Sequence, residues 1–291
     1  MNLNPLHENK SNFEHSIQHR IRQALFLECT AIKAGNVHPS ASFHDLKYPQ
    51  FVDASVSISE RIAECLNESV GVIVLRSVQA MMECVGTNTS LGTILLIGPL
   101  AVAVNRLENE NKAKSELPTS ITETLSQLDA GDSRCIYEAI RTAKPGGLGE
   151  SRLMDIQQVA PARIVDAMQT AADWDDIALQ YATNFELVFG YARRIMESVS
   201  NGTNWLATIR KLQIEILSER VDSLIVRKGG MDFAKQVQTR ATRVLSSGCY
   251  GSQPYETAWD QFDRFLRDDQ HVGNPGTTAD LITAALFLSI R

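Results

Sequence analysis

The stretch VGVIVLRSVQAMMECVGTNTSLGTILLIGPLAVAVNRL, residues 70–107, decides the fold that this sequence predicts. Residues 70–84 are apolar on most sides of a helix, which indicates a helix buried in the protein interior. The polar turn 86–90 ends that helix, and the strongly apolar residues 91–107 predict a second one. Two buried helices joined by such a turn are typical of the centre of a helical bundle.

Outward from this pair, apolar residues recur at three- and four-residue steps, which predicts helices along nearly the whole chain. Before the pair, the pattern predicts helices over 13–34, which Gly35 and Pro39 end, and over 51–66. After the pair, the predicted helices are 119–129, 132–143, 161–172, 175–199, 203–219, 231–247, 255–269 and 277–290. We therefore expect an all-α protein: a flexible N-terminus of residues 1–12, then a single-domain multi-helix bundle with buried central helices over 13–291.

The composition limits the classes of function. The net charge of −6 disfavours a broad nucleic-acid surface but allows a local basic pocket. The five cysteines are widely spaced and form no C-x-x-C pair, so neither a zinc site nor a disulfide framework is indicated. The N-terminus lacks an apolar signal core, and the apolar run 91–104 is too short to span a bilayer and contains Pro99. We expect a cytoplasmic protein that binds neither nucleic acid nor membrane.

Turns rich in glycine, asparagine or basic residues interrupt the helices, and we expect the chemistry there. They are 33–39, 86–92, 144–150, 222–230 and 273–280. A helix start offers backbone N–H groups and the positive end of the helix dipole, which suit a phosphate group. Arg227 and Lys228 add a planar fork and a point charge for phosphate oxygens. Each turn taken alone has a plain alternative: a capped helix–helix turn, a flexible loop at 144–150, or basic residues at 227–228 that face water.

The turn at 33–39 and the loop after it carry the most titratable groups. His38 and His44 are candidates for acid–base catalysis, and Asp45 is a candidate magnesium ligand or base. The alternative is that these loop histidines are merely exposed. The remaining histidines, His7, His15, His19 and His271, are given no functional role.

Four of these motifs, in this order, resemble the motifs of the triphosphoribosyl-dephospho-CoA synthase family. The similar segments are 33–37 with 44–45 (family K-P-G-N/L-V, then H/K-D), 86–92 (G-x-N-T-x-K-G), 222–230 (D-T/S-x-L/I-x-x-R-G-G) and 274–281 (N-x-S-P-G-G-S-A-D-L). The sequence departs from the family at Ala34, where proline is usual, at Leu91, where lysine is usual, and in the extra Lys228. The form of the 86–92 turn resembles a branch found in archaea and in bacteria with methanopterin-type one-carbon coenzymes.

The resemblance covers nearly the whole chain and implies a reaction. Family members make the prosthetic-group precursor for the acyl carriers of citrate lyase and malonate decarboxylase. They transfer the triphosphoribosyl group of ATP to the 2′-hydroxyl of 3′-dephospho-CoA, with release of adenine. The resemblance thus implies ATP and a CoA-like or other coenzyme-precursor acceptor as partners, and Mg²⁺ as a cofactor bound with ATP.

The same resemblance suggests a role for each motif residue. His44, Asp45, Glu150 and Asp222 would be catalytic, with Asp45 and Asp222 as metal ligands or stabilisers of an oxocarbenium-like transition state and His44 or Glu150 moving the proton. Phosphates would bind Lys33, Arg227 and Lys228, and the ribose or a phosphate would bind Asn88 and Thr89. The other expected contacts to substrate are Gly35, Asn36, Gly92, Gly229, Gly230, Asn274 and Asp280.

Two alternatives remain open from sequence. The first, which Leu91 favours, is transfer of a phosphoribosyl-type group to a different acceptor in one-carbon coenzyme synthesis. The second is a non-catalytic helical protein that binds nucleotide. A homodimer is compatible with the sequence, which does not determine the oligomeric state.

Overall fold

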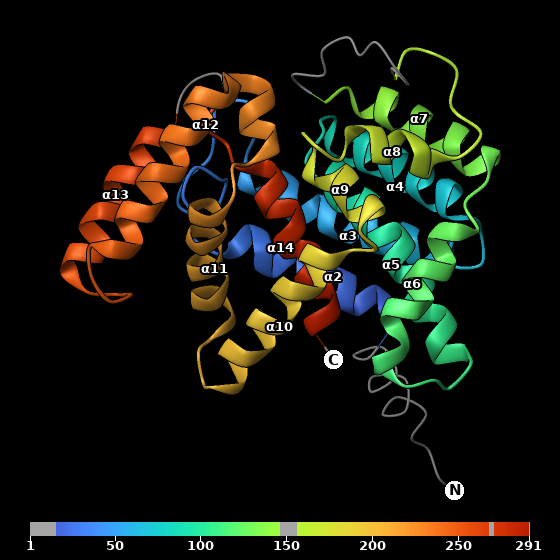
Figure 1. The fold of residues 1–291 in the computed structure, drawn as a ribbon, viewed down its shortest axis with the longest axis horizontal. Coiled ribbons are helices and arrows are strands. Elements are labelled where there is room, and N and C mark those ends of the chain that lie inside the picture. Colours follow the sequence, from blue (N-terminus) through green and yellow to red (C-terminus); the bar gives the residue numbers. More distant parts are fainter. Residues whose placement is uncertain (1–15, 146–155, 268–270, 291) are drawn as a thin grey trace, which may run out of the picture.

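The computed structural model describes residues 16–145, 156–267 and 271–290. Within them the chain forms thirteen α-helices, one short 3-10 helix and no β-strand (Figure 1), which confirms the all-α class. The predicted flexible N-terminus, residues 1–12, lies outside the described residues. The helices are α2 (Ile17–Thr30), α3 (Tyr48–Glu64), α4 (Val70–Val85), α5 (Leu91–Asn109), η1 (Lys114–Glu116), α6 (Leu117–Ser126), α7 (Ala130–Ala143), α8 (Ile164–Ala171), α9 (Asp176–Ala182), α10 (Glu186–Ser200), α11 (Trp205–Glu219), α12 (Ser223–Ser246), α13 (Gln253–Leu266) and α14 (Gly276–Ser289).

The predicted buried pair, α4 and α5, lies in the core, and α14 joins it there. Thirteen of the nineteen residues of α5 are buried. Every residue of α14 from position 281 to 287 is also buried, because α14 packs against α2, α5 and α10. In Figure 1, α14 runs through the middle of the molecule, with α4, α7 and α8 on one side and α11, α12 and α13 on the other. The helices after α9 thus meet the earlier ones along this central helix.

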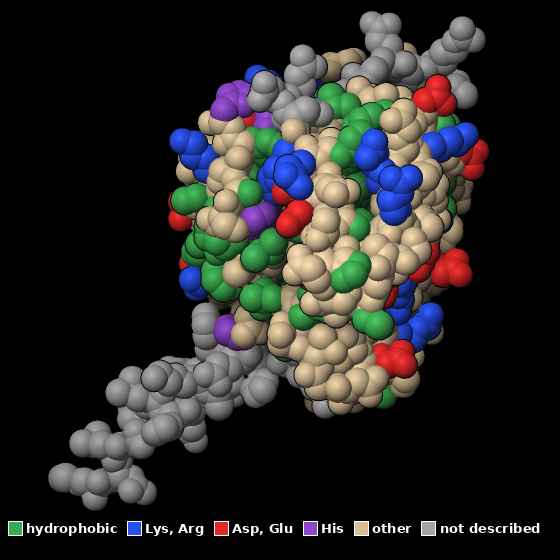
Figure 2. Space-filling model, turned by 90° about the vertical axis from the view of Figure 1, so that its left-hand side faces the viewer, with side chains coloured by type: hydrophobic (Ala, Val, Ile, Leu, Met, Phe, Trp, Pro, Cys, Tyr) green, Lys and Arg blue, Asp and Glu red, His purple; other side chains and the backbone are tan. Residues whose placement is uncertain are grey.

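Helix α5 is the only described helix long and apolar enough, by length and composition alone, to cross a membrane. Two thirds of its apolar window, 67%, is buried inside the protein, as expected for a core helix. On the face of the molecule that carries α13, Lys and Arg side chains are scattered over the surface and do not form one basic stripe (Figure 2).

Helix α5 continues through Pro99, which has no backbone N–H to donate to the carbonyl of Leu95 four residues earlier. The hydroxyl of Tyr181 on α9 donates to this carbonyl instead, at 2.7 Å. Complete burial raises the pKa of Tyr181, so the hydroxyl keeps its proton and remains a donor. A side chain from α9 therefore supplies the hydrogen bond that the proline removes from the core helix.

Two predicted helix boundaries were wrong. The helix predicted over 175–199 is two helices, α9 and α10, because Asn184 and Phe185 adopt the left-handed backbone conformation, with φ of 53° and 66°. Helix α12 starts at Ser223, well before the predicted 231, and contains a break at Gly230, where φ is 81° and ψ is 166°. The glycine pair 229–230 thus bends a helix and does not precede one.

A close backbone contact between α4 and α7 gives a test of the core packing. A Cβ atom added to Gly71 would lie 2.5 Å from the Cα atom of Asp132, so Gly71→Ala must push the two helices apart. We expect a loss of about 1–3 kcal/mol of stability, seen as a lower thermal unfolding midpoint. The matched control is Gly190→Ala on α10, where an added Cβ meets no atom within 4 Å. Alanine there should raise stability by up to about 1 kcal/mol, and equal effects of the two variants would contradict the packing.

Candidate functional site

A cavity of about 690 Å³ opens beside the core helices, and residues from all five turns line it. Of the residues proposed from sequence, nine lie on its surface: Asn36, Asp45, Asn88, Thr89, Gly92, Arg227, Lys228, Asn274 and Asp280. The turn 144–150 adds Lys144, but Glu150 lies outside the described residues. Seven proposed residues do not line the cavity: Lys33, Gly35, His38, His44, Asp222, Gly229 and Gly230. Segments that are more than two hundred residues apart in sequence thus line the same cavity.

Amide side chains connect the first turn to the last. The Nδ2 atom of Asn36 donates to the Oδ1 atom of Asn274 at 2.8 Å. Gln213 on α11 donates to Asn36 Oδ1 at 2.8 Å and accepts from the backbone N–H of Ala34 at 2.8 Å. Gly35 allows the backbone conformation of this turn, because its φ is 71° and a Cβ atom added to it would lie 2.8 Å from Leu266. The turn is therefore fixed in place by side-chain hydrogen bonds before any ligand arrives.

Lys33, expected to bind phosphate, is instead completely buried. Its Nζ atom lies 2.9 Å from a carboxylate oxygen of Glu28 and 2.7 Å from the Glu28 carbonyl oxygen. A buried ammonium with these partners neutralises Glu28, which lines the cavity, and does not reach a ligand. The proposed role of Lys33 is wrong for this structural reason.

Asp222, expected to be catalytic and a metal ligand, is a buried helix cap with a relative exposure of 2%. Its Oδ1 atom accepts from the N–H groups of Leu224 and Ile225, at 2.9 and 3.1 Å. Its Oδ2 atom accepts from the N–H and the hydroxyl of Thr278, at 2.7 and 2.8 Å. Both oxygens are thus engaged away from the cavity. The prediction for Asp222 is corrected: it ties the start of α12 to the start of α14.

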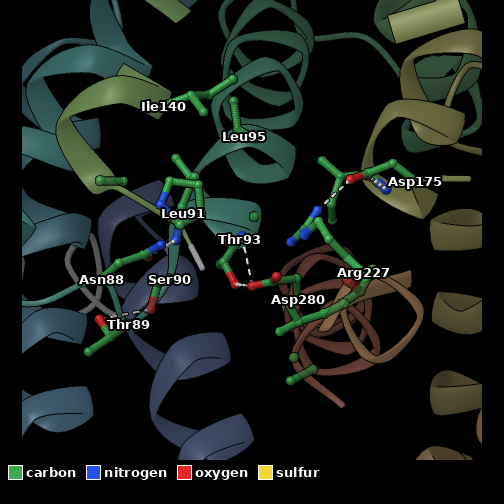
Figure 3. A pocket seen from close by; sticks show the side chains of 18 of the residues that line it. Asn88, Thr89, Ser90, Leu91, Thr93, Leu95, Ile140, Asp175, Arg227 and Asp280 are labelled. Atoms are coloured by element: carbon green, nitrogen blue, oxygen red, sulfur yellow. Dashed lines mark hydrogen bonds and ion pairs between the residues drawn. The ribbon is translucent and has the colours of Figure 1, made fainter. Parts of the chain in front are cut away.

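Asp280 on α14 connects that helix to the start of α5 in a similar way. Its Oδ1 atom accepts from the backbone N–H of Thr93, at 2.8 Å, and from the Thr93 hydroxyl (Figure 3). A Cβ atom added to Gly92 would lie 2.1 Å from the Oδ2 atom, so only glycine leaves room for this carboxyl group. Burial raises the pKa of Asp280 to about 7. The start of α5 is therefore capped by a carboxyl group of the protein.

Carboxylates of the protein thus already occupy the helix starts at which the sequence suggested phosphate binding. Cations on side chains offer the remaining anion sites. The Nη1 atom of Arg227 lies 3.0 Å from a carboxylate oxygen of Asp175, and its guanidinium projects toward the Asp280 side of the cavity (Figure 3). The Nε atom of Arg227 is buried and has no hydrogen-bond partner within the described part of the chain. Asp175 in turn caps α9 by accepting from Ile177 N–H at 2.8 Å.

Three polar side chains meet at another part of the site. The Nε2 atom of His271 lies 2.7 Å from Asp45 Oδ1, and the Nδ1 atom of His44 lies 3.6 Å from the same oxygen. Their ligand-type atoms all lie within 4.8 Å of one another, so the three could hold a divalent cation. Asp45 and His271 line the cavity, whereas His44, 71% exposed at its side chain, lies outside the lining and is not placed for proton transfer within it.

His38 is not an acid–base group at this site. It is buried, and its Nε2 atom lies 3.2 Å from Nη2 of Arg267. Burial, reinforced by the charges of Arg267 and Lys33, lowers the pKa of His38 to about 4. The imidazole therefore stays neutral near pH 7 and braces the loop against α13.

Apolar side chains make up much of the remaining lining. They include Leu25, Phe51, Met82, Leu91, Leu95, Ile140, Ile164, Met168, Trp174 and Ile177. Leu91 is one of them, at the position where the resembled family has lysine. Four further residues line the cavity that the sequence did not single out: Glu28, Thr93, Asp175 and His271. Asp175, directly before α9, carried the signal of a helix cap, but its partner Arg227 was not evident.

Comparisons with known proteins agree with this picture. The family model for CitG, described as ATP:dephospho-CoA triphosphoribosyl transferase, matches residues 14–291. A crystal structure from Archaeoglobus fulgidus, assigned as a triphosphoribosyl-dephospho-CoA synthase, superimposes with a TM-score of 0.62 and 23% sequence identity. The match covers 82% of this chain and 96% of that one, and at this identity it supports the fold alone. No curated protein matches the sequence. Because the family model spans nearly the whole sequence, the chain belongs to the CitG family, that of the ATP:dephospho-CoA triphosphoribosyl transferases.

Proposed function

We propose that the protein transfers the triphosphoribosyl group of ATP to the 2′-hydroxyl of 3′-dephospho-CoA and releases adenine. The observation that carries this proposal is the convergence of the motif turns on one cavity, which is lined by the cations Arg227 and Lys228 and by many apolar side chains. A polyphosphate nucleotide likewise combines an anionic part with a flat, weakly polar base. The family to which the chain belongs acts on ATP and dephospho-CoA.

Basic side chains of α12 bind the triphosphate. Arg227 and Lys228 lie side by side in sequence on α12 and both line the cavity. Asp175 engages one Nη atom of Arg227, and the rest of this guanidinium, whose side chain is 26% exposed, would bind a phosphate oxygen. Asn88 already caps α5 by accepting from Leu91 N–H at 3.0 Å, which leaves its amide NH₂ to donate to a phosphate or ribose oxygen.

Magnesium enters this proposal as the ion bound to ATP. A magnesium ion in such a site is held by one or two carboxylates, phosphate oxygens and waters. Asp45 lines the cavity with a side chain that is 56% exposed, so its carboxylate is placed to bind the magnesium ion. Asp222 is not, because hydrogen bonds in the interior engage both of its oxygens. When bound, the ion would neutralise charge on the triphosphate. The protein residues then position the ribose carbon against the acceptor hydroxyl.

A related activity is the second candidate. Leu91 makes the cavity apolar where the resembled family places a cation, so an acceptor with fewer phosphates than dephospho-CoA would fit this position better. Transfer of the same group from ATP to a one-carbon coenzyme precursor is the alternative that this residue favours.

The direct test is an assay for free adenine. With magnesium, ATP and 3′-dephospho-CoA, we expect one adenine released for each triphosphoribosyl-dephospho-CoA formed, measured by liquid chromatography with mass detection. Omitting the acceptor is the control, because hydrolysis of ATP releases phosphate and no adenine. Adenine release only with a different acceptor would establish the second candidate. ATP binding without adenine release for any acceptor would indicate a non-catalytic nucleotide-binding protein.

The proposed phosphate contact predicts the behaviour of Arg227→Gln. Loss of a charge-assisted hydrogen bond costs about 1.5–3 kcal/mol, so the Kd for ATP should rise roughly 10- to 150-fold in calorimetric titrations. The control is Arg194→Gln, which removes an arginine of similar exposure that pairs with Glu215 and Glu219 and does not line the cavity. An unchanged Kd in Arg227→Gln, or an equal increase in both variants, would contradict phosphate binding by Arg227.

A further inference from the structure

Among the described residues, four carboxyl groups line the cavity, and Asp280 differs from the other three. The other three each lie against a basic side chain: Glu28 against Lys33, Asp45 against His271 and Asp175 against Arg227. Asp280 has no ion-pair partner in the described part of the chain. Two hydrogen bonds from Thr93 engage its Oδ1 atom, while its Oδ2 atom, beside Gly92, has no hydrogen-bond donor among the described residues.

The surroundings of Asp280 favour its neutral form. It lies deep in the protein, and the surface it keeps faces the cavity. The pKa of Asp280 is raised to about 7, and desolvation is the largest cause. The negative charges of Glu28 on α2 and Asp222 at the start of α12 also raise this pKa, whereas the hydrogen bonds that Thr93 on α5 donates lower it. Of the cations beside the cavity, Lys33 pairs with Glu28, Arg227 pairs with Asp175, and the Nζ atom of Lys228 lies 3.5 Å from the carbonyl oxygen of His271.

A nucleotide triphosphate brings several negative charges into this cavity. Negative charge close to a carboxyl group disfavours its ionisation, so binding of ATP shifts Asp280 further toward the protonated form. A protonated carboxyl group can donate a proton but cannot accept one. The hydrogen bonds of Thr93 stabilise Oδ1 as an acceptor, which leaves Oδ2 as the oxygen that carries the proton.

We infer that Asp280 is the general acid that protonates the departing adenine, with Thr93 and Gly92 as the residues that position its carboxyl group. The inference rests on the proposed function and assigns a catalytic residue to the same site. In this step the bond between the ribose anomeric carbon and N9 of adenine breaks, its electron pair passes to the base, and Asp280 supplies the proton. The acceptor oxygen forms the new bond to that carbon, and the hydroxyl proton passes to solvent. A proton from solvent then restores Asp280.

The variant Asp280→Asn keeps an oxygen that can accept from Thr93 and removes the acidic proton. We expect adenine release to fall about 10²- to 10⁴-fold, the range typical of general acid catalysis, while the Kd for ATP changes less than threefold. Wild-type turnover should be highest where Asp280 is protonated and should decline as pH rises through a value of about 7 or above, and this alkaline decline should be absent in Asp280→Asn. The same decline in the variant would overturn the assignment.

Two further measurements separate a catalytic from a structural role. Thr93→Val removes a hydrogen bond that lowers the pKa of Asp280, so the alkaline decline should move to higher pH, whereas a structural tie alone would leave the pH profile in place. An ATP analogue methylated at N7 carries a base that departs without protonation. With this analogue, the factor by which Asp280→Asn slows release of the base should be at least tenfold smaller than with ATP. An equal factor for both nucleotides would overturn the inference.

Failure of the proposed function is distinguishable from failure of this inference. If the wild-type protein releases no adenine with any acceptor, the proposed function fails, and the protonation of Asp280 is still measurable. Infrared difference spectra of the ATP complex should show a protonated carboxyl band in the wild-type protein that Asp280→Asn lacks. Absence of this band near pH 7 would overturn the inference regardless of turnover.

Discussion

The structure depends on two carboxyl groups, of Asp222 and Asp280, that each connect the start of one helix to another helix. Asp222 accepts four hydrogen bonds from the starts of α12 and α14, and Asp280 on α14 accepts from the start of α5. Each unpaired N–H group at a helix start would cost free energy if buried without an acceptor. The two aspartates meet this need and, in doing so, set the relative positions of three helices. The cavity lies where those helix starts meet.

This arrangement changes how an anion is recognised. Helix starts are common phosphate sites because of their free N–H groups and their dipole. Here the protein places its own carboxyl groups there, so under the proposed function the side chains of Arg227 and Lys228 would bind the polyphosphate. The cavity thus combines acidic groups held by the backbone with cations carried on α12. Such a site can hold a nucleotide and also keep one carboxyl group close to neutrality.

Most of the fold was accessible from sequence, because the burial of α5 follows from apolar residues on nearly every side and α4 carries an apolar face of eight buried residues. The break between α9 and α10 was not, since Phe185 is apolar, fits the helical period and shows its left-handed backbone only in the structure. The turns that line the cavity were also evident from their residue types and order. Their partners were not: a sequence does not show whether a lysine such as Lys33 faces a ligand or an internal carboxylate.

The same limit explains the residues that were missed. Asp175 is a helix cap by its position, and its second role emerges only when Arg227, fifty-two residues later, lies against it. His271 is a lone histidine in sequence and becomes part of the site only through Asp45, 226 residues away. Long-range pairs of this kind are set by packing, which local pattern does not encode.

The hydrogen bond from Tyr181 to the Leu95 carbonyl makes two distant positions dependent on each other. While position 99 is proline, a phenylalanine at 181 would leave a buried carbonyl without a donor. With an ordinary residue at 99, the helix would satisfy that carbonyl itself, and the hydroxyl at 181 would become dispensable. Across related chains the two positions should therefore vary together, and the order of change is constrained. Loss of the proline can precede loss of the tyrosine, whereas the reverse order passes through a destabilised intermediate.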